Sequence, residues 1–243
     1  MDKFVKIIIT VIIFIAIILG IILVSNKSKQ TDTINNSNKE PINDISKDNN
    51  DNKKANEITF GKYYNDTNEL EDIEWIILEE NEESMLLITK YAINSVPYNN
   101  SLKETTWDNS DIRTWLNEEF YNMAFTDAEK NAIISTNNKA QINPNHKDTP
   151  IGKDTKDNVF LLSYDEIVYY FPNKENRLLT PTNYAIMQGC YTNSDGNVAW
   201  WTRSVGISET SPEYLASAGD FGNREHQVNE NIIGTRPAVW IKK

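Results

Sequence analysis

The chain has very little cysteine and histidine and no cluster of basic residues. Its single cysteine, Cys190, excludes an intrachain disulfide and a zinc site built on paired cysteines. Its two histidines, His146 and His226, lie too far apart in the sequence to indicate a histidine-based metal site. The 24 Lys and Arg are outnumbered by 35 Asp and Glu, and this net charge of −11 repels the phosphates of nucleic acid. We therefore expect no metal, no cofactor and no nucleic-acid partner.

What the sequence does contain is one long apolar run near its start. Residues 7–25 are apolar except for Thr10 and Ser25. These 19 residues would span about 28 Å as a helix, close to the ~30 Å hydrocarbon core of a bilayer. The run is longer than the roughly 7–15 apolar residues of a signal peptide and lacks an Ala-x-Ala-like cleavage site. We therefore expect an uncleaved single-pass anchor at 7–25 rather than a cleaved signal peptide.

The orientation of this anchor rests on its short N-terminus. Lysines stand on both sides of the apolar run, so the positive-inside signal is nearly balanced. Short N-termini usually stay inside, which places residues 1–6 in the cytoplasm. The expected localisation is the cell membrane, with the C-terminal domain outside the cytoplasm.

A polar segment separates the anchor from the rest of the chain. Residues 26–56 consist mainly of Asn, Lys, Asp, Ser and Thr, with almost nothing to bury. Such a segment cannot offset its ordering entropy, and we expect a disordered tether. The remaining residues, 57–243, are enough for one folded domain.

The beginning of this domain has the pattern of strands. Residues 58–63, 73–78 and 84–91 are rich in β-branched and aromatic residues. The polar residues 79–83 between the last two runs are typical of a hairpin turn. This pattern predicts a three-stranded antiparallel meander.

Helical spacing follows the meander. The residues of one helical stripe recur three or four apart, and all but one are apolar: Ile112, Trp115, Leu116, Glu119, Phe120 and Met123. Capping boxes at Thr126 and Ser163 predict two further helices, and Pro181 and Thr182 begin a short one that Gly189 ends.

The other segments are shorter or irregular. Residues 136–157 are polar and predict a long surface loop, and residues 159–162 predict a buried strand. The Gly- and Asn-rich remainder predicts short strands at 198–204, 214–218, 226–228 and 235–241. The order of elements indicates an α+β fold with antiparallel sheets and short flanking helices.

Two motifs carry a resemblance to a known family. Residues 200–204 read Trp-Trp-Thr-Arg-Ser, and residues 234–238 read Gly-Thr-Arg-Pro-Ala. With the strand and helix motifs before them, they resemble a bacterial extracytoplasmic domain family of unknown function that carries Trp-Trp-x-Arg-Ser and Gly-x-Arg-Pro-Ala signatures. The resemblance covers essentially all of residues 57–243.

More remotely, the closing pattern resembles the C-type-lectin-like fold. This resemblance implies paired N- and C-terminal strands, two flanking helices and an irregular region where ligands bind. The chain lacks the cysteines that formylglycine-generating enzymes of this fold use for oxidation. It also lacks the Glu-Pro-Asn type loop of calcium-dependent lectins, so neither activity is expected.

The Trp-Trp-Thr-Arg-Ser motif supplies two candidate binding residues. Neighbouring strand residues point to opposite faces, so only one of Trp200 and Trp201 can lie in the core, and the other lies against another layer or a ligand. Trp201 and Arg203 share a face and could offer a stacking surface and a hydrogen-bond donor to a sugar or a carboxylate. The structural alternative ties Arg203 to a core carboxylate and covers Trp201 with a loop. For Arg236 we expect a salt bridge that closes the sheet.

A polar, glycine-flanked segment supplies three more candidates. Arg224, Glu225 and His226 lie in residues 219–226, which the lectin-like resemblance places among the ligand-facing loops. Glu225 and His226 have the residue types of general acid–base chemistry, but neighbours on a strand point opposite ways. The alternative is a surface hairpin with no ligand.

The sequence thus favours a membrane-anchored recognition domain that binds a cell-envelope glycan, peptide or protein through residues 190–230. One alternative is a cell-envelope hydrolase or transferase that uses Glu225 and His226. Another is a structural or assembly module without a small ligand. No set of catalytic residues is indicated, because no Gly-x-Ser-x-Gly motif accompanies the histidines.

Overall fold

The computed structural model describes residues 56–66 and 69–243. The predicted anchor at 7–25 lies outside these residues, as does the predicted tether except for its last residue. Within the described ranges, no helix is long and apolar enough to cross a membrane.

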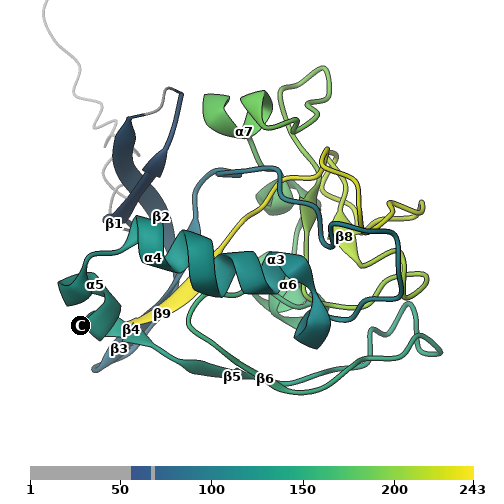
Figure 1. Cartoon of the computed structure of the whole chain (residues 1–243), viewed down its shortest axis with the longest axis horizontal. Helices are drawn as coiled ribbons and strands as arrows, with labels where there is room; N and C mark the ends of the chain where they lie inside the picture. The colour runs from purple at the N-terminus through teal and green to yellow at the C-terminus, as the bar shows by residue number, and fades with distance from the viewer. Residues whose placement is uncertain (1–55, 67–68) are drawn as a thin grey trace, which may run out of the picture. The chain divides into compact units, whose positions relative to one another are not determined.

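The main sheet has five strands in the order β1-β2-β3-β9-β4 (Figure 1). All its neighbouring strands run antiparallel. Its strands are β1 (Glu57–Tyr64), β2 (Leu70–Glu80), β3 (Ser84–Thr89), β9 (Ala238–Lys242) and β4 (Ile133–Ile134). The first three form the predicted meander, which is confirmed.

Alternation along β2 shows why this strand forms. Ile73 and Trp75 are buried, whereas Glu74 between them is exposed. The indole of Trp75 is fully buried, and its Nε1 donates to the carbonyl of Phe60 on β1 at 2.7 Å. Burial and hydrogen bonding of one side chain therefore join the first two strands.

A helical run, broken only at Ser110, crosses in front of the sheet in Figure 1, and its last turn contacts β1. Ser110 caps the start of α3 within this run by accepting from the backbone N–H of Arg113. The run begins with a 3-10 turn and changes to π-helical geometry in the middle. Its parts are η1 (Trp107–Asn109), α3 (Asp111–Trp115), η2 (Leu116–Phe120, the π-helical turn) and α4 (Tyr121–Ala124).

The shorter helices have the predicted caps. Capping boxes at Thr126 and Ser163 start α5 (Asp127–Ala132) and α6 (Tyr164–Tyr170), which confirms both. Thr182 caps α7 (Asn183–Met187), and Gly189 follows with φ 116. A 3-10 turn, η3 (Lys174–Arg177), lies between α6 and α7.

The rest of the domain is less regular than the sequence predicts. The expected strands at 198–204 and 214–218 are reduced to a two-residue pair, β7 (Trp200–Trp201) and β8 (Tyr214–Leu215). The strand expected at 226–228 is absent from the described residues, and residues 159–162 are buried but contribute only a bridge from Phe160 to Ala238. Beyond β7, a hydrogen bond to a loop takes the place of strand pairing, because the backbone N–H of Arg203 donates to the carbonyl of Leu162.

The predicted loop at 136–157 is bounded by a second small sheet. Its ends pair as β5 (Thr136–Asn138) and β6 (Thr155–Asp157). The domain is therefore a mixed α+β fold with antiparallel sheets and a few short helices.

The closing strand takes a different place from the one the lectin-like resemblance implies. β9 lies between β3 and β4, and two strands separate it from β1. The first and last strands of the domain share a sheet but do not pair, because the meander places β3, not β1, beside β9.

Candidate functional site

Trp201 and Arg203 are buried. The Trp201 indole lies between Tyr98 and Tyr214, with ring centroids 5.6 and 6.3 Å away. The guanidinium of Arg203 forms an ion pair with Glu166 of α6 and donates to the carbonyl of Leu161 at 2.9 Å. This is the arrangement of the structural alternative, and neither side chain lines the clefts described below.

Trp200 and Trp201 are both fully buried, on opposite faces of β7. The Trp200 Nε1 donates to the carbonyl of Arg177 at 3.0 Å, and its ring lies 5.0 Å from the guanidinium of Arg236. The strand is therefore covered on both sides, and each tryptophan packs in a separate layer.

The prediction of a salt bridge for Arg236 is wrong. This side chain is buried, and within the described part of the chain no carboxylate pairs with it. Its Nε donates to the carbonyl of Thr89 at 3.0 Å, and the rings of Phe171 and Trp200 flank the guanidinium. Desolvation lowers the pKa of Arg236 to about 9. Cation–π contacts take the place of the expected anion.

A cleft of about 500 Å³ opens on the irregular half of the domain. We name it the Tyr191 cleft, after the aromatic side chain that is 70% exposed on its wall. Its wall combines aromatic rings with polar and charged side chains: Tyr191, Tyr214, Asp220, Phe221, Arg224 and His226. Two of the five predicted binding residues, Arg224 and His226, thus meet here.

Two glycines let the chain form this wall. Gly219 adopts φ 85, a left-handed conformation that favours glycine, and it closes a turn onto the carbonyl of Ala216. Gly222 passes close to Tyr214, because a Cβ at this position would lie 2.1 Å from the phenol ring. The segment can therefore fold tightly over β8.

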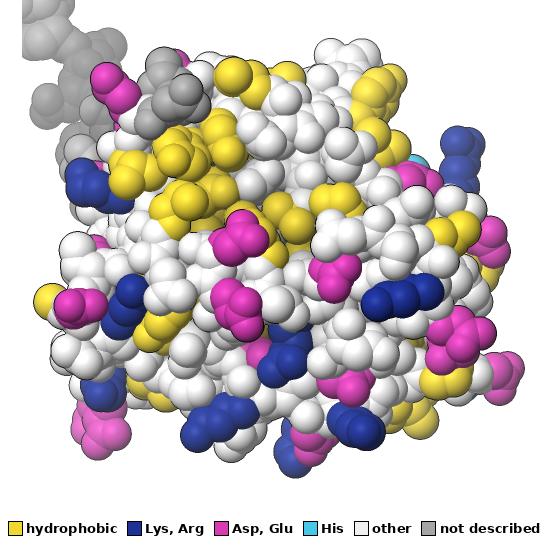
Figure 2. All heavy atoms as spheres, viewed as in Figure 1, with side chains coloured by type: hydrophobic (Ala, Val, Ile, Leu, Met, Phe, Trp, Pro, Cys, Tyr) yellow, Lys and Arg dark blue, Asp and Glu magenta, His cyan; other side chains and the backbone are white. Residues whose placement is uncertain are grey.

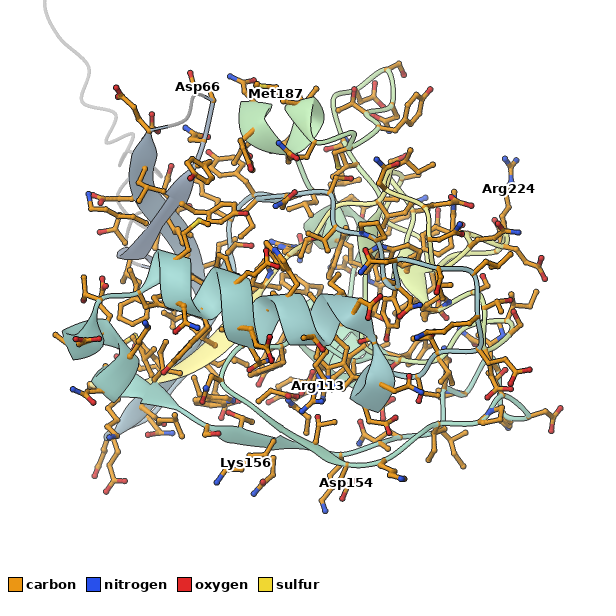
Figure 3. All side chains as sticks on the ribbon, in the orientation of Figure 1. Asp66, Arg113, Asp154, Lys156, Met187 and Arg224 are labelled. Atoms are coloured by element: carbon orange, nitrogen blue, oxygen red, sulfur yellow. The ribbon has the colours of Figure 1, made fainter. Side chains whose placement is uncertain are left out.

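The polar side chains of the cleft differ in whether they already have bonding partners within the domain. His226 is held, because its Nδ1 lies 2.6 Å from Glu230 Oε2 and its ring packs edge-on against Tyr214. Arg224 forms no ion pair with any described residue, and Figure 3 shows its side chain projecting away from the body of the domain. Arg224 is therefore available to an anionic group of a ligand.

Glu225 does not join this site. It is exposed and lines none of the clefts described here. His226 pairs with Glu230 four residues away, so Glu225 and His226 do not form an acid–base pair.

A second pocket of about 350 Å³ shares a wall with the Tyr191 cleft. Tyr214, Phe221 and Arg224 line both hollows. We name it the Glu213 pocket because its wall holds the carboxyl of Glu213, which is only 2% exposed. The two hollows adjoin along segment 221–224.

Glu213 has the surroundings of a proton donor. Its Oε2 accepts from Asn143 Nδ2 at 2.8 Å and lies 3.4 Å from His146 Nε2. Burial raises the pKa of the Glu213 carboxyl, against the opposing effect of the Asn143 hydrogen bond. Burial also lowers the pKa of His146, which favours the neutral imidazole.

No sequence pattern indicates the pair of Glu213 and His146. His146 lies in the long polar loop, where it looks merely solvated, and Glu213 follows a proline at the start of a predicted strand. Their approach depends on the loop folding back over residues 205–213, where Asn143 Nδ2 also donates to the carbonyl of Val205.

No described residues form a group of three or more His, Cys, Asp or Glu side chains that could hold a metal ion. Cys190 is buried, and burial raises the pKa of its thiol to about 11. A thiol in that state is a poor nucleophile.

These observations define the protein as a mixed α+β domain with two adjoining hollows on its irregular half. The chain belongs to the family described as a domain of unknown function (DUF6273), whose model matches residues 82–243. No curated protein and no solved structure matches the chain. Membership of a family of unknown function is thus confirmed, and the match begins in the turn between β2 and β3.

Proposed function

We propose that this protein is a membrane-anchored extracytoplasmic recognition domain that binds a cell-envelope glycan or peptide in the Tyr191 cleft. The observation that carries the proposal is the exposed Tyr191 ring in one cleft with the unpaired guanidinium of Arg224. The apolar run at 7–25 supports the anchor, and the polar residues 26–56 support a tether.

The chemistry of the cleft favours a ligand with both apolar faces and anionic groups. Sugar rings and peptide side chains pack on aromatic faces, and a guanidinium binds a carboxylate with paired hydrogen bonds. Asp220 and Asn223 add an acceptor and an amide to the same wall. Such a set suits an envelope polymer with hydroxyl and carboxylate groups, such as a peptidoglycan fragment.

The lectin-like fold is also part of this proposal. Its support is the position of the Tyr191 cleft in the Gly- and Asn-rich half, where that resemblance places ligands. The separation of β1 from β9 makes any such relationship a distant one.

Binding of soluble peptidoglycan fragments to the full chain in nonionic detergent tests the recognition function by calorimetry. We expect Tyr191→Ala and Arg224→Ala each to weaken binding about tenfold or more, because each removes one of the two recognition elements. Tyr169→Ala is the matched control, since Tyr169 is 75% exposed but lies on α6 outside the cleft. Equal loss in the control, or no binding by the wild type, would overturn the proposal.

Mass spectrometry of the membrane fraction tests the anchor. An intact N-terminus is expected. A new N-terminus near Asn26 would show cleavage and would contradict the anchored form.

A second function, an envelope hydrolase, is favoured by one observation: the buried Glu213 carboxyl beside His146 at a pocket wall. A carboxyl with a raised pKa can protonate a leaving group. Glu213→Gln would then abolish hydrolysis of an envelope fragment and leave binding in the Tyr191 cleft intact. Unchanged turnover in this variant would exclude Glu213 as the acid.

A further inference from the structure

A third cleft lies on the sheet side of the domain and shares no residue with the two hollows above. Its volume is about 420 Å³, and its aromatic walls come from β1, α3 and α7. We name it the Trp115 cleft; its aromatic residues are Tyr63, Tyr64, Trp115 and Tyr184, with Phe120 beneath. Figure 2 shows a contiguous hydrophobic surface at the upper left of this face, with acidic side chains at its lower border.

Two rings of the cleft stand at right angles to the ring of Tyr63. Tyr63 is nearly perpendicular to Trp115, at 86° and 6.3 Å, and to Tyr184, at 88° and 5.7 Å. Asn94 Nδ2 donates to the Tyr63 hydroxyl at 2.8 Å and fixes this central ring. Perpendicular walls surround a rounded group on more than one side, whereas a flat sugar ring stacks on one face.

Glu119 is a charged residue among the apolar and aromatic residues of this cleft. It is the single carboxylate in the apolar stripe of the helical run, and it lies in the π-helical turn η2. Such turns are often found at functional sites, because the wider turn displaces a side chain from its ordinary position. Glu119 lines the Trp115 cleft and has no ion pair with any residue in the described ranges.

The charge of the cleft points to the sign of its occupant. Among the residues that the structure describes, no lysine, arginine or histidine lines it, and Glu119 is the only charged residue of that lining. The faces of tyrosine and tryptophan rings are negative, and they attract cations within about 6 Å. The carboxylate and the aromatic faces of the wall therefore favour a positive group.

We infer that the Trp115 cleft binds an organic cation, an ammonium or trimethylammonium group, between its aromatic walls and the Glu119 carboxylate. The site is independent of the proposed recognition of an envelope polymer in the Tyr191 cleft. Its cation can come from a choline-bearing compound or from the lysine side chain of a peptide.

Calorimetric titration of the full chain in nonionic detergent with choline tests the inference. The matched ligand is 3,3-dimethyl-1-butanol, an uncharged molecule of the same shape. We expect the neutral molecule to bind about tenfold more weakly or not at all, since cation–π and ion-pair attraction are lost. Titration with N-acetyl-lysine methylamide separates a peptide source from a choline source, and binding of either cation supports the site.

Two neighbouring carboxylates give a matched pair of variants. Glu119→Gln removes the charge from the cleft and is expected to weaken cation binding about fivefold or more. Glu118→Gln changes the adjacent exposed carboxylate, which does not line the cleft, and is expected to have no effect. Both side chains are exposed, so both variants should fold.

The site is overturned by any of three results. These are no binding of either cation, equal binding of the neutral molecule, or equal weakening by the Glu118 and Glu119 variants. Binding of an envelope polymer to the Tyr191 cleft would be unaffected by any of them, so this test and that of the proposed function can fail separately.

Discussion

Two buried arginines of the signature motifs are stabilised in different ways. Arg203 has a carboxylate partner in Glu166, which is itself the last member of a capping box. Arg236 has aromatic rings and one carbonyl instead. An ion pair offsets the desolvation of Arg203 with an opposite charge, whereas Arg236 relies on the ring faces and one hydrogen bond. The two motifs therefore stabilise different sheets through different chemistry: Arg203 follows β7 of the small sheet, and Arg236 precedes β9 of the main sheet.

Glu213 carries the first prediction at the residue scale. Its folded-state pKa is raised, so between the usual glutamate value and the folded value the folded protein binds the proton more tightly than the unfolded chain. The contribution of Glu213 to stability is therefore largest at acidic pH and is lost as the pH rises through its folded pKa. Asn143 and His146 face the carboxyl, and burial lowers the pKa of His146, which favours the neutral form of that ring.

Glu213→Gln should consequently stabilise the protein at pH 8 relative to the wild type, and the advantage should shrink toward pH 4.5. Denaturant unfolding of both proteins at a series of pH values measures this difference. A constant difference across the series would show that the folded and unfolded carboxyls have the same pKa. Glu225→Gln, which changes an exposed carboxylate nearby, is the control variant in the same series.

At the scale of elements, one carboxylate joins the helical run to the small sheet. Asp157 of β6 is buried, and Arg113 Nε of α3 donates to it at 2.6 Å. Trp107 of η1 donates to the same carboxylate at 3.1 Å and Asn138 of β5 at 2.8 Å. Three elements, α3, η1 and β5, thus donate to one carboxylate on a fourth, β6. Figure 3 shows Arg113 below the helix on the side of Lys156 in β6.

Asp157→Ala should cost about 3–5 kcal/mol of unfolding free energy, because it leaves the donors around it without a partner in a buried site. Asp154→Ala is the control. It removes an exposed ion pair with Lys139 and should cost less than about 1 kcal/mol. Thermal or denaturant unfolding compares the two, and similar costs would contradict the role given to the buried network.

At the scale of the molecule, the folded unit is longer than the family match. The match begins at residue 82, yet β1 and β2 precede it and belong to the same sheet. β3 lies between β2 and β9, so its backbone groups and the buried Leu87 and Ile88 depend on both neighbours. The first two strands are therefore part of the domain.

A chain of residues 82–243 should accordingly be much less stable than one of residues 57–243. It loses Trp75 from the core and exposes an edge of β3 that can pair with other chains. Circular dichroism with thermal unfolding measures the difference, and light scattering detects the expected aggregation. Equal melting temperatures for the two chains would show that β1 and β2 are not needed for the stability of the domain.

Much of the architecture could be predicted because it depends on local physics. The alternation around Trp75 and the capping boxes at Thr126 and Ser163 act over a few residues, and the structure confirms both. The strands of the second half were predicted too long. Arg203, for example, has strand-like neighbours in sequence, but its backbone N–H donates to the carbonyl of Leu162. That partner lies about 40 residues away in the chain, so local sequence does not predict it.

The sequence by itself therefore determined the elements that short-range hydrogen bonding and periodic burial define, together with the α+β class. Only the tertiary structure decided which side chains face a cleft. It buried Trp201 and Arg203, left Arg224 on a rim, joined Glu213 to His146 and set Glu119 among aromatic rings. These outcomes depend on contacts between segments far apart in the chain, and the neighbours of a residue in sequence do not predict such contacts.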